Sequence, residues 1–295
     1  MTTSPAVETR GLQKQYGRKR ALADCSIGVP TGAVCGVVGA NGSGKTTLLK
    51  LLCGLLRPTG GEARVCQRQP ADERTFLETV GYLGQEVPLY GRWTADEHLR
   101  FGAHTNDTWD ETMARERLLS LDIPLDQRVQ TLSGGMRAQV ALALALGKRP
   151  SVLLLDEPVA ALDPLARREF LASLTAAVAD GEVTVLMSSH LLPDLERVCD
   201  HLVLLSDGSA LVCAEIDELV ASHKQVTAPR ADAARAARTM SVLSTSTTTR
   251  DVSLTVRIDH AIIDPSWRVD DLDLEEIVLA YLGGSSQREQ VGTAS

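Results

Sequence analysis

The sequence of 295 residues lacks a surplus of basic residues, a long apolar segment and closely spaced cysteine pairs. Its net charge of -8 argues against a general nucleic-acid-binding protein, because such proteins usually carry an excess of lysine and arginine. No stretch approaches the roughly 20 apolar residues that a membrane-spanning helix needs. Any role at a membrane is therefore expected to depend on a separate partner chain.

The cysteines and the N-terminus indicate the compartment in which the protein is expected to work. The 6 cysteines are scattered along the chain, which is typical of reduced and mostly buried thiols. Residues 1–10 lack the basic start and apolar core of a signal peptide. We therefore expect a cytoplasmic protein. At this length, one main domain with a smaller appendage is the natural expectation.

Residues 39–46 fit the pattern G-x-x-x-x-G-K-[ST] of a phosphate-binding loop. A short apolar run precedes the loop and leucines at helical spacing follow it, as the motif requires. The glycines allow backbone amides to face the phosphates, while Lys45 brings a positive charge and the Thr46 hydroxyl can bind magnesium. The positive end of the following helix points at the same anion. The sequence therefore predicts a nucleoside triphosphate site.

Residues 152–157 form a second apolar strand, which ends in Asp156 and Glu157. Asp156 is placed to hold magnesium directly or through water, and Glu157 could polarise an attacking water as a general base. His190 follows the next predicted strand, residues 183–189. Parallel strands end at one edge of a sheet, where ligands bind in α/β folds. We therefore expect His190 to contact the terminal phosphate and the water.

The order of strands and helices predicts an α/β protein with a P-loop NTPase core. A helix with Asp163 and Pro164 at its start lies between the two apolar strands, which favours a mostly parallel sheet. Residues 202–213 contain a hairpin signal at Asp207 and Gly208, which adds an antiparallel β part. Residues 97–146 contain no convincing strand and are expected to form an inserted helical lobe.

The composition changes after about residue 221. Alternating apolar residues at 252–258 predict a half-buried strand, and residues 274–282 predict a helix with one apolar stripe. We therefore expect a main domain at residues 1–221, a small α+β extension at residues 222–284, and a disordered tail at residues 285–295.

Seven motifs, taken in order, resemble those of the nucleotide-binding subunit of an ATP-binding-cassette (ABC) transporter, across roughly residues 7–219. Residues 39–47 match its Walker A loop, residues 132–136 its signature, residues 152–157 its Walker B strand, and residues 161–163 its D-loop. Tyr16 matches the aromatic residue that stacks on adenine, Gln85 the Q-loop glutamine, and His190 the switch histidine.

The resemblance implies ATP and Mg²⁺ as ligands and assigns a role to each matching residue. The metal contacts are Thr46, Gln85 and Asp156, and the catalytic residues are Lys45, Gln85, Glu157 and His190. The nucleotide contacts are Tyr16, Gly39, Asn41, Gly42, Ser43, Gly44, Lys45, Thr46, Thr47, Ser133, Gly134 and Gly135.

The residue types of the signature also predict an anion-binding site, independently of the family resemblance. Ser133 is expected to cap a helix whose first amides are left bare by Gly134 and Gly135, which makes a second anion site at a helix N-terminus. In the family, two subunits pair head-to-tail and hold each ATP between one Walker A loop and the opposite signature. The resemblance therefore implies a homodimer.

Three positions depart from the family pattern. Met136 stands where glutamine is commonest, Ala161 where glycine is frequent, and Gly84 where proline often precedes the glutamine. None of these changes removes a group that contacts phosphate. The site is therefore expected to be competent for hydrolysis, and methionine at the signature is frequent in the export branch of the family.

The single cassette, the absence of a membrane segment and the C-terminal extension resemble ABC-2 type exporters, including antibiotic and multidrug export ATPases. We therefore expect an ATPase that drives export through a separate permease at the inner face of the membrane. Residues 85–94, with Tyr90 and Trp93, either contact that permease or form only loop packing, and the C-terminal helix either packs on its own cassette or contacts a second subunit. The alternatives are a non-transport cassette protein and a low-turnover ATP-binding regulatory module.

Overall fold

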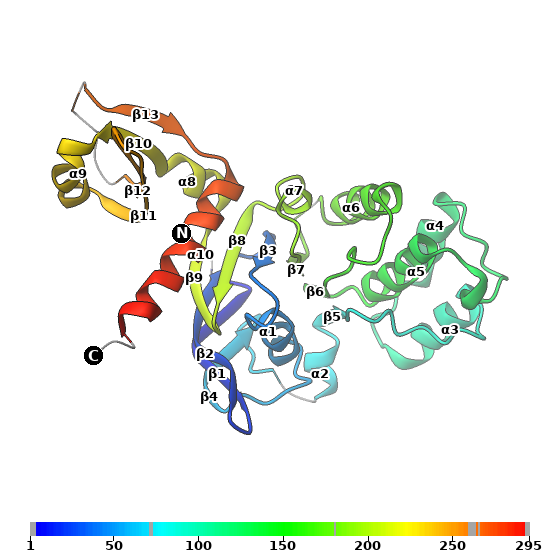
Figure 1. Ribbon diagram of the computed structural model, residues 1–295. Helices are drawn as coiled ribbons and strands as arrows, with labels where there is room; N and C mark the ends of the chain where they lie inside the picture. Colours follow the sequence, from blue (N-terminus) through cyan, green and yellow to red (C-terminus); the bar gives the residue numbers. More distant parts are fainter. Residues whose placement is uncertain (1–3, 71–72, 180, 259–263, 265, 293–295) are drawn as a thin grey trace. The chain divides into compact units, whose positions relative to one another are not determined.

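The computed structural model describes residues 4–70, 73–179, 181–258, 264 and 266–292 (Figure 1). The chain divides into two compact units, Met1–Cys213 and Ala214–Ser295. Across the described parts of the chain, none of the helices combines the length and the apolar character needed to cross a membrane.

The first unit contains the predicted P-loop core. Its strands are β1 (Val7–Tyr16), β2 (Lys19–Val29), β3 (Val34–Val38), β4 (Gly60–Val65), β5 (Val80–Leu83), β6 (Val152–Asp156), β7 (Thr184–Ser188), β8 (His201–Ser206) and β9 (Ser209–Glu215). Its helices are α1 (Lys45–Leu52), α2 (Arg74–Leu77), α3 (Ala95–Thr105), α4 (Glu111–Ser120), α5 (Gly134–Gly147), α6 (Pro164–Val178) and α7 (Leu192–Leu195), with a 3-10 turn at Val129–Thr131.

The strands form one 9-stranded sheet in the order β4-β1-β2-β9-β8-β3-β7-β6-β5. The five strands from β8 to β5 pair in parallel, whereas β1 pairs antiparallel with both β2 and β4. The predicted α/β class, with a mostly parallel sheet and an antiparallel part, is confirmed. The hairpin predicted at residues 202–213 is present as β8 and β9, which flank Asp207 and Gly208 and are neighbours in the sheet, and the N-terminal strands β1, β2 and β4 add further antiparallel pairs.

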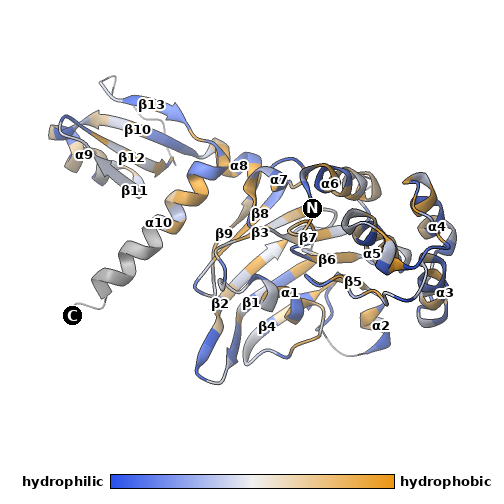
Figure 2. Cartoon of the chain, turned by 45° about the vertical axis from the view of Figure 1, so that its right-hand side comes forward, coloured by the Kyte–Doolittle hydropathy of each residue, from blue (hydrophilic) through white to orange (hydrophobic). Residues whose placement is uncertain are grey.

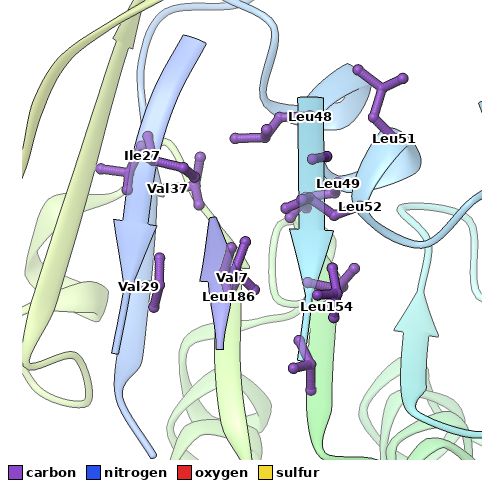
Figure 3. Close-up of a cluster of buried hydrophobic side chains, with 14 of the residues drawn as sticks. Val7, Ile27, Val29, Val37, Leu48, Leu49, Leu51, Leu52, Leu154 and Leu186 are labelled. Atoms are coloured by element: carbon purple, nitrogen blue, oxygen red, sulfur yellow. The ribbon is translucent and has the colours of Figure 1, made fainter. Parts of the chain in front are cut away.

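Every residue of β6 and of β7 is buried. Central parallel strands are covered on both faces, which explains why these segments read as continuous apolar runs. Three leucines of α1, Leu48, Leu49 and Leu52, belong to the same buried cluster as Leu154 of β6 and Leu186 of β7 (Figure 3). This packing fixes the start of α1 beside the ends of both strands.

The helical lobe has a core of its own. Leu99 of α3, Leu118 of α4 and Val140 of α5 are buried together with Val129 and Leu132. α3 begins at Ala95 because Thr94 and Glu97 form a capping box, in which each side chain binds the other residue's backbone amide. The helices of the lobe thus occupy residues 95–147.

The second unit has a 4-stranded antiparallel sheet in the order β11-β12-β10-β13. Its strands are β10 (His223–Pro229), β11 (Ser241–Thr247), β12 (Asp251–Arg257) and β13 (Arg268–Asp271), and its helices are α8 (Ile216–Ala221), α9 (Ala233–Thr239) and α10 (Leu274–Gly292). Apolar and polar residues alternate around the first turns of α10 (Figure 2).

The division between the units falls before α8, earlier than residue 221, because α8 packs with β10 and α10. Residues 285–292, expected as part of a disordered tail, continue α10. Residues 293–295 lie outside the described residues.

Candidate active site

The phosphate loop connects β3 to α1, and at two of its positions the surrounding atoms leave room only for glycine. A Cβ atom on Gly39 would lie 2.3 Å from the Leu205 carbonyl oxygen, and one on Gly44 would lie 2.7 Å from the Ala21 carbonyl oxygen. Both residues also have positive φ angles, of 155° and 110°. Among the residues that the structure describes, no side chain caps the first turn of α1, so its amides remain available to an anion.

Lys45 lies inside this loop and is nearly buried, with 7% of its side chain exposed. Its Nζ atom donates to the Gly39 carbonyl oxygen at 2.7 Å and to the Ala40 carbonyl oxygen at 3.3 Å. The same atom lies 3.9 Å from Oε1 of Glu157. The loop thus holds a positive charge at the place where the motif requires one.

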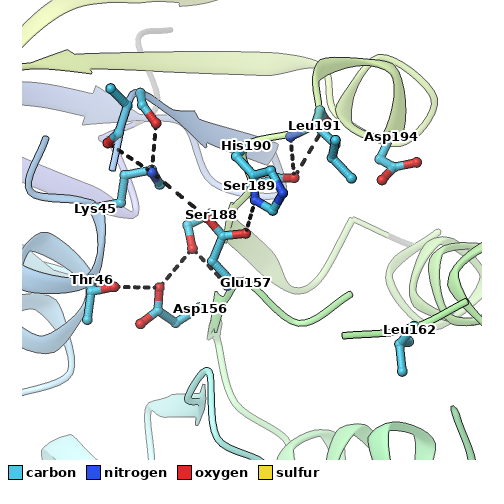
Figure 4. Close-up of polar contacts among 12 residues, drawn as sticks. Lys45, Thr46, Asp156, Glu157, Leu162, Ser188, Ser189, His190, Leu191 and Asp194 are labelled. Atoms are coloured by element: carbon cyan, nitrogen blue, oxygen red, sulfur yellow. Dashed lines mark hydrogen bonds and ion pairs between the residues drawn. The ribbon is translucent and has the colours of Figure 1, made fainter. Parts of the chain in front are cut away.

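Asp156 ends β6 and is buried beside the start of α1. Its Oδ1 atom accepts hydrogen bonds from the Thr46 hydroxyl at 3.0 Å and from the Ser188 hydroxyl at 2.9 Å (Figure 4). Its Oδ2 atom is buried and has no hydrogen-bond partner among the described residues. A buried carboxylate oxygen left bare next to a hydroxyl fits a hard divalent cation such as Mg²⁺.

Glu157 follows directly and turns away from the strand. Its φ angle is 50°, a left-handed conformation that is uncommon for a residue with a side chain. Its Oε2 atom lies 2.9 Å from Nδ1 of His190, and its backbone amide donates to the Ser188 hydroxyl at 2.8 Å (Figure 4). The carboxylate therefore lies between the cation of Lys45 and the imidazole of His190.

A cavity of about 580 Å³ opens beside these groups. Predicted residues from four separate parts of the chain line it, namely Tyr16, the phosphate loop, Gln85 and Glu157. Its full lining is Tyr16, Lys19, Ala21, Asn41, Gly42, Gly44, Lys45, Thr46, Thr47, Gln85 and Glu157. Asp156 and His190 do not line the cavity themselves, but each contacts a residue that does. Asp156 is hydrogen-bonded to Thr46, and His190 to Glu157.

Tyr16 ends β1 and is half exposed, so one ring face can receive a base. The Nζ atom of Lys14 lies 5.3 Å from the centre of its ring and donates to the Arg57 carbonyl oxygen at 2.7 Å. This ammonium backs the ring through a cation–π contact. Sequence reasoning missed Lys14, although its position two residues before Tyr16 in a strand places both on one face.

Ser133, Gly134 and Gly135 do not line the cavity. Ser133 caps α5 by accepting the Met136 amide at 3.1 Å, as predicted from its position. A Cβ atom on Gly135 would lie 2.8 Å from Cβ of Ala166 in α6. Gly135 therefore allows α5 to start close to α6, and this helix end lies apart from the phosphate loop of the same chain.

An apolar pocket of about 330 Å³ lies in the helical lobe beside β5. Tyr90 and Phe101 line it and are 56% and 46% exposed, and Trp93 packs beside Tyr90 with the two rings tilted by 36° and their centres 4.6 Å apart. His98 is buried and fixes this loop, because its Nε2 accepts the Tyr90 amide at 3.0 Å and its Nδ1 donates to the Thr94 carbonyl oxygen at 2.8 Å. The hydrogen bonds of His98 thus hold the backbone of the loop that carries the exposed rings.

Residues 22–160 match a protein-family model described as ABC transporter. The chain is 37% identical to an ABC transporter ATP-binding protein of Nostoc sp. over 75% of this chain and 70% of that protein. It is 34% identical to Nod factor export ATP-binding protein I of Burkholderia orbicola, over 70% of each chain. It is 32% identical to the molybdenum import ATP-binding protein ModC of Rhodopseudomonas palustris, over 96% of this chain and 78% of that protein.

A solved structure of the ATP-binding subunit of an ABC transporter superposes with a TM-score of 0.65 and 29% sequence identity. The superposition covers 72% of this chain and 91% of that chain. The similarity therefore extends from the sequence to the arrangement of the sheet and its helices.

Proposed function

The chain belongs to the ABC transporter ATP-binding family, and from this premise we propose that it is an ATPase subunit that drives export through a separate membrane protein. In this proposal two copies pair head-to-tail and hydrolyse ATP at their shared boundary. One observation carries it: the nucleotide cavity gathers Lys45, Gln85 and Glu157 but takes no residue from the signature. The second anion-binding helix end is therefore free to serve another copy.

The residues divide the work of hydrolysis between them. Tyr16 stacks on the adenine, and the loop amides with Lys45 hold the phosphates. Thr46, Asp156 and Gln85 are the residues that would hold Mg²⁺, which neutralises charge that develops on the phosphates. Glu157 accepts a proton from the attacking water, and His190 orients the Glu157 carboxylate through its bond to Oε2.

Replacing Glu157→Gln tests the catalytic assignment. The amide keeps the size of the side chain but is a far weaker base, so we expect ATP binding to persist and turnover to fall by at least about 100-fold. Radiolabelled ATP binding and phosphate release measure the two properties. Glu169→Gln on the exposed surface of α6 is the matched control. Unchanged turnover in Glu157→Gln would remove Glu157 from the mechanism.

Mixing two inactive variants tests the shared site. Ser133→Arg blocks the signature, and Lys45→Ala disables the phosphate loop, so each variant alone should lack turnover. Ser133→Arg should still bind ATP, because its own cavity is intact. In a mixed head-to-tail dimer, one of the two sites combines an intact loop with an intact signature. ATPase activity should therefore return on mixing, whereas a mixture that stays inactive argues against a site shared in this way.

The pocket around Tyr90 supports a membrane partner on this face of the helical lobe. Exposed apolar and aromatic side chains on a fixed loop are typical of an interaction site. We propose that residues 85–94 contact the permease, which places the subunit at the inner face of the membrane. Tyr90→Ser should leave basal ATPase activity intact and weaken its stimulation by the co-expressed permease.

The proposal also specifies the direction of transport. Export is supported by the exporter relative and by the resemblance of the C-terminal region to that of ABC-2 type exporters. The importer relative makes direction the property to measure. ATP-driven uptake of cargo into inside-out vesicles would support export, and uptake into right-side-out vesicles would contradict it. A low-turnover regulatory module is excluded if the purified chain hydrolyses ATP at an ordinary rate.

A further inference from the structure

We propose that Ser188 is a positioning residue for ATP hydrolysis, which holds Asp156 and Glu157 in their working conformations. This role rests on the proposed function of the two acids. The Ser188 hydroxyl donates to Oδ1 of Asp156 at 2.9 Å and accepts the backbone amide of Glu157 at 2.8 Å. One hydroxyl group thus joins both acidic residues from the neighbouring strand (Figure 4).

The position of Ser188 follows from the register of the sheet. β6 and β7 run in parallel, and Asp156 is the register partner of Ser188 at the end of both strands. Ser188 is fully buried, so water cannot replace its hydroxyl group. Loss of the hydroxyl would therefore leave a part-buried amide and one buried carboxylate oxygen each short of a bond.

The bond to the Glu157 amide matters because the backbone of Glu157 is strained. With a φ angle of 50°, this residue occupies a region that costs energy and persists only where surrounding contacts enforce it. The left-handed turn directs the carboxylate toward Lys45 and His190. The Lys45 contact is long at 3.9 Å and His190 is half exposed, so the 2.8 Å bond to the fully buried Ser188 is the restraint on this turn that is best shielded from water.

The bond to Asp156 acts on the other carboxylate. Ser188 and Thr46 both donate to Oδ1, which leaves Oδ2 bare and buried. The two hydroxyl groups thereby fix the rotation of the carboxylate and determine which oxygen remains available for a cation. Ser188 therefore prepares Asp156 for metal binding and positions Glu157 for the attack of water on ATP, although it does not itself line the nucleotide cavity.

Ser188→Ala removes the hydroxyl and changes little else in volume. We expect kcat to fall about 10- to 100-fold, because small misplacements of catalytic groups have effects of this size, with the KM for ATP changed by less than about threefold. Ser188→Thr keeps the hydroxyl and should recover much of the lost rate. Thr184→Val is the matched control, because Thr184 is equally buried on β7 and its hydroxyl accepts the Gly32 amide at 2.9 Å, away from the acids.

Two readouts separate positioning from a general loss of structure. Thermal unfolding should shift similarly in Ser188→Ala and Thr184→Val, whereas only Ser188→Ala should lose turnover. In the Glu157→Gln background, Ser188→Ala should slow the residual single-turnover rate by less than it does in the wild-type background, because one of the two groups it positions is already disabled.

The possible failures are distinguishable. If Glu157→Gln retains turnover, the proposed function of Glu157 fails, and the role of Ser188 fails with it. If Glu157→Gln loses turnover but Ser188→Ala keeps a wild-type kcat, only the role of Ser188 is overturned. Equal losses of kcat in Ser188→Ala and Thr184→Val would also overturn it, because a buried hydroxyl anywhere on β7 would then have the same effect.

Discussion

At the scale of single residues, the site depends on a few positions where the surrounding atoms leave no room for any other side chain. Gly39 shows this most clearly, because a Cβ atom would meet both the Leu205 carbonyl oxygen and the Ser43 hydroxyl within 2.5 Å. A contact this close with backbone cannot be relieved by rotating a side chain. The loop would have to open, and the amides that face the phosphates would move with it.

We therefore expect Gly39→Ala to weaken ATP binding by at least about tenfold, because the loop donors no longer converge on the phosphates. Titration with a fluorescent ATP analogue measures the affinity. Gly28→Ala in β2 is the control, because no atom of the described residues lies within 4 Å of a Cβ atom there and no positive φ angle is involved. Equal affinities in both variants would show that the loop tolerates expansion.

The residues that carry a motif could be found from the sequence, and those that support them could not. Lys45, Asp156, Glu157 and His190 were predicted because each residue type has a direct role in phosphate chemistry. Ser188 was missed because serine at a strand end carries no such signal on its own. Its partner became evident only when the register placed it opposite Asp156.

At the scale of elements, helix caps and strand hydropathy were predictable, whereas the pairing of weakly apolar strands was not. The core strands β6 and β7 are entirely buried, so their sequences read as apolar runs. In β1 the burial pattern is irregular, and its register with β2 shifts at several points. Such a strand owes its place to the sheet around it, and local sequence contains little of that information.

Three elements of the second unit meet at a buried histidine. His223 begins β10, and its Nδ1 atom donates to the Leu219 carbonyl oxygen of α8 at 2.7 Å. Its Nε2 atom accepts from the Tyr281 hydroxyl of α10 at 3.1 Å. Burial lowers the pKa of His223 below its ordinary value of 6.5, and the nearby positive charge of Arg257 lowers it further.

This lowered pKa predicts a loss of stability in acid. The unfolded chain binds a proton at His223 more readily than the folded chain, so the free energy of unfolding should fall as the pH drops below about 6.5 toward the folded pKa. Urea unfolding between pH 7.5 and 5 would measure the slope. His223→Gln should reduce it, because glutamine keeps polar groups near both partners and does not titrate. An unchanged slope would contradict the assignment.

At the scale of the whole molecule, the two compact units have separate cores. The nucleotide cavity lies entirely in the first unit, and the sheet of the second unit packs on its own apolar cluster. The division lies at residue 213, before α8, whereas the change in composition lies near residue 221. Composition marks where the sequence changes, but it does not reveal which neighbours a short connecting helix will contact.

We expect the chain shortened to residues 1–213 to retain ATP binding within about threefold of the full chain, because it keeps every residue that lines the cavity. Binding of a fluorescent ATP analogue, together with circular dichroism, measures affinity and folding. Lys45→Ala in the shortened chain is the negative control. A folded fragment without ATP affinity would show that the second unit contributes to the site.

The contacts of Lys45 have a consequence for how its charge is presented to a phosphate. Its ammonium group donates to two carbonyl oxygens of its own loop, at 2.7 Å and 3.3 Å. An ammonium group has three N–H donors, so the third donor can turn to a phosphate oxygen while the first two hold the group in place. The charge is therefore preorganised, and binding of the phosphates does not require a rearrangement of this side chain.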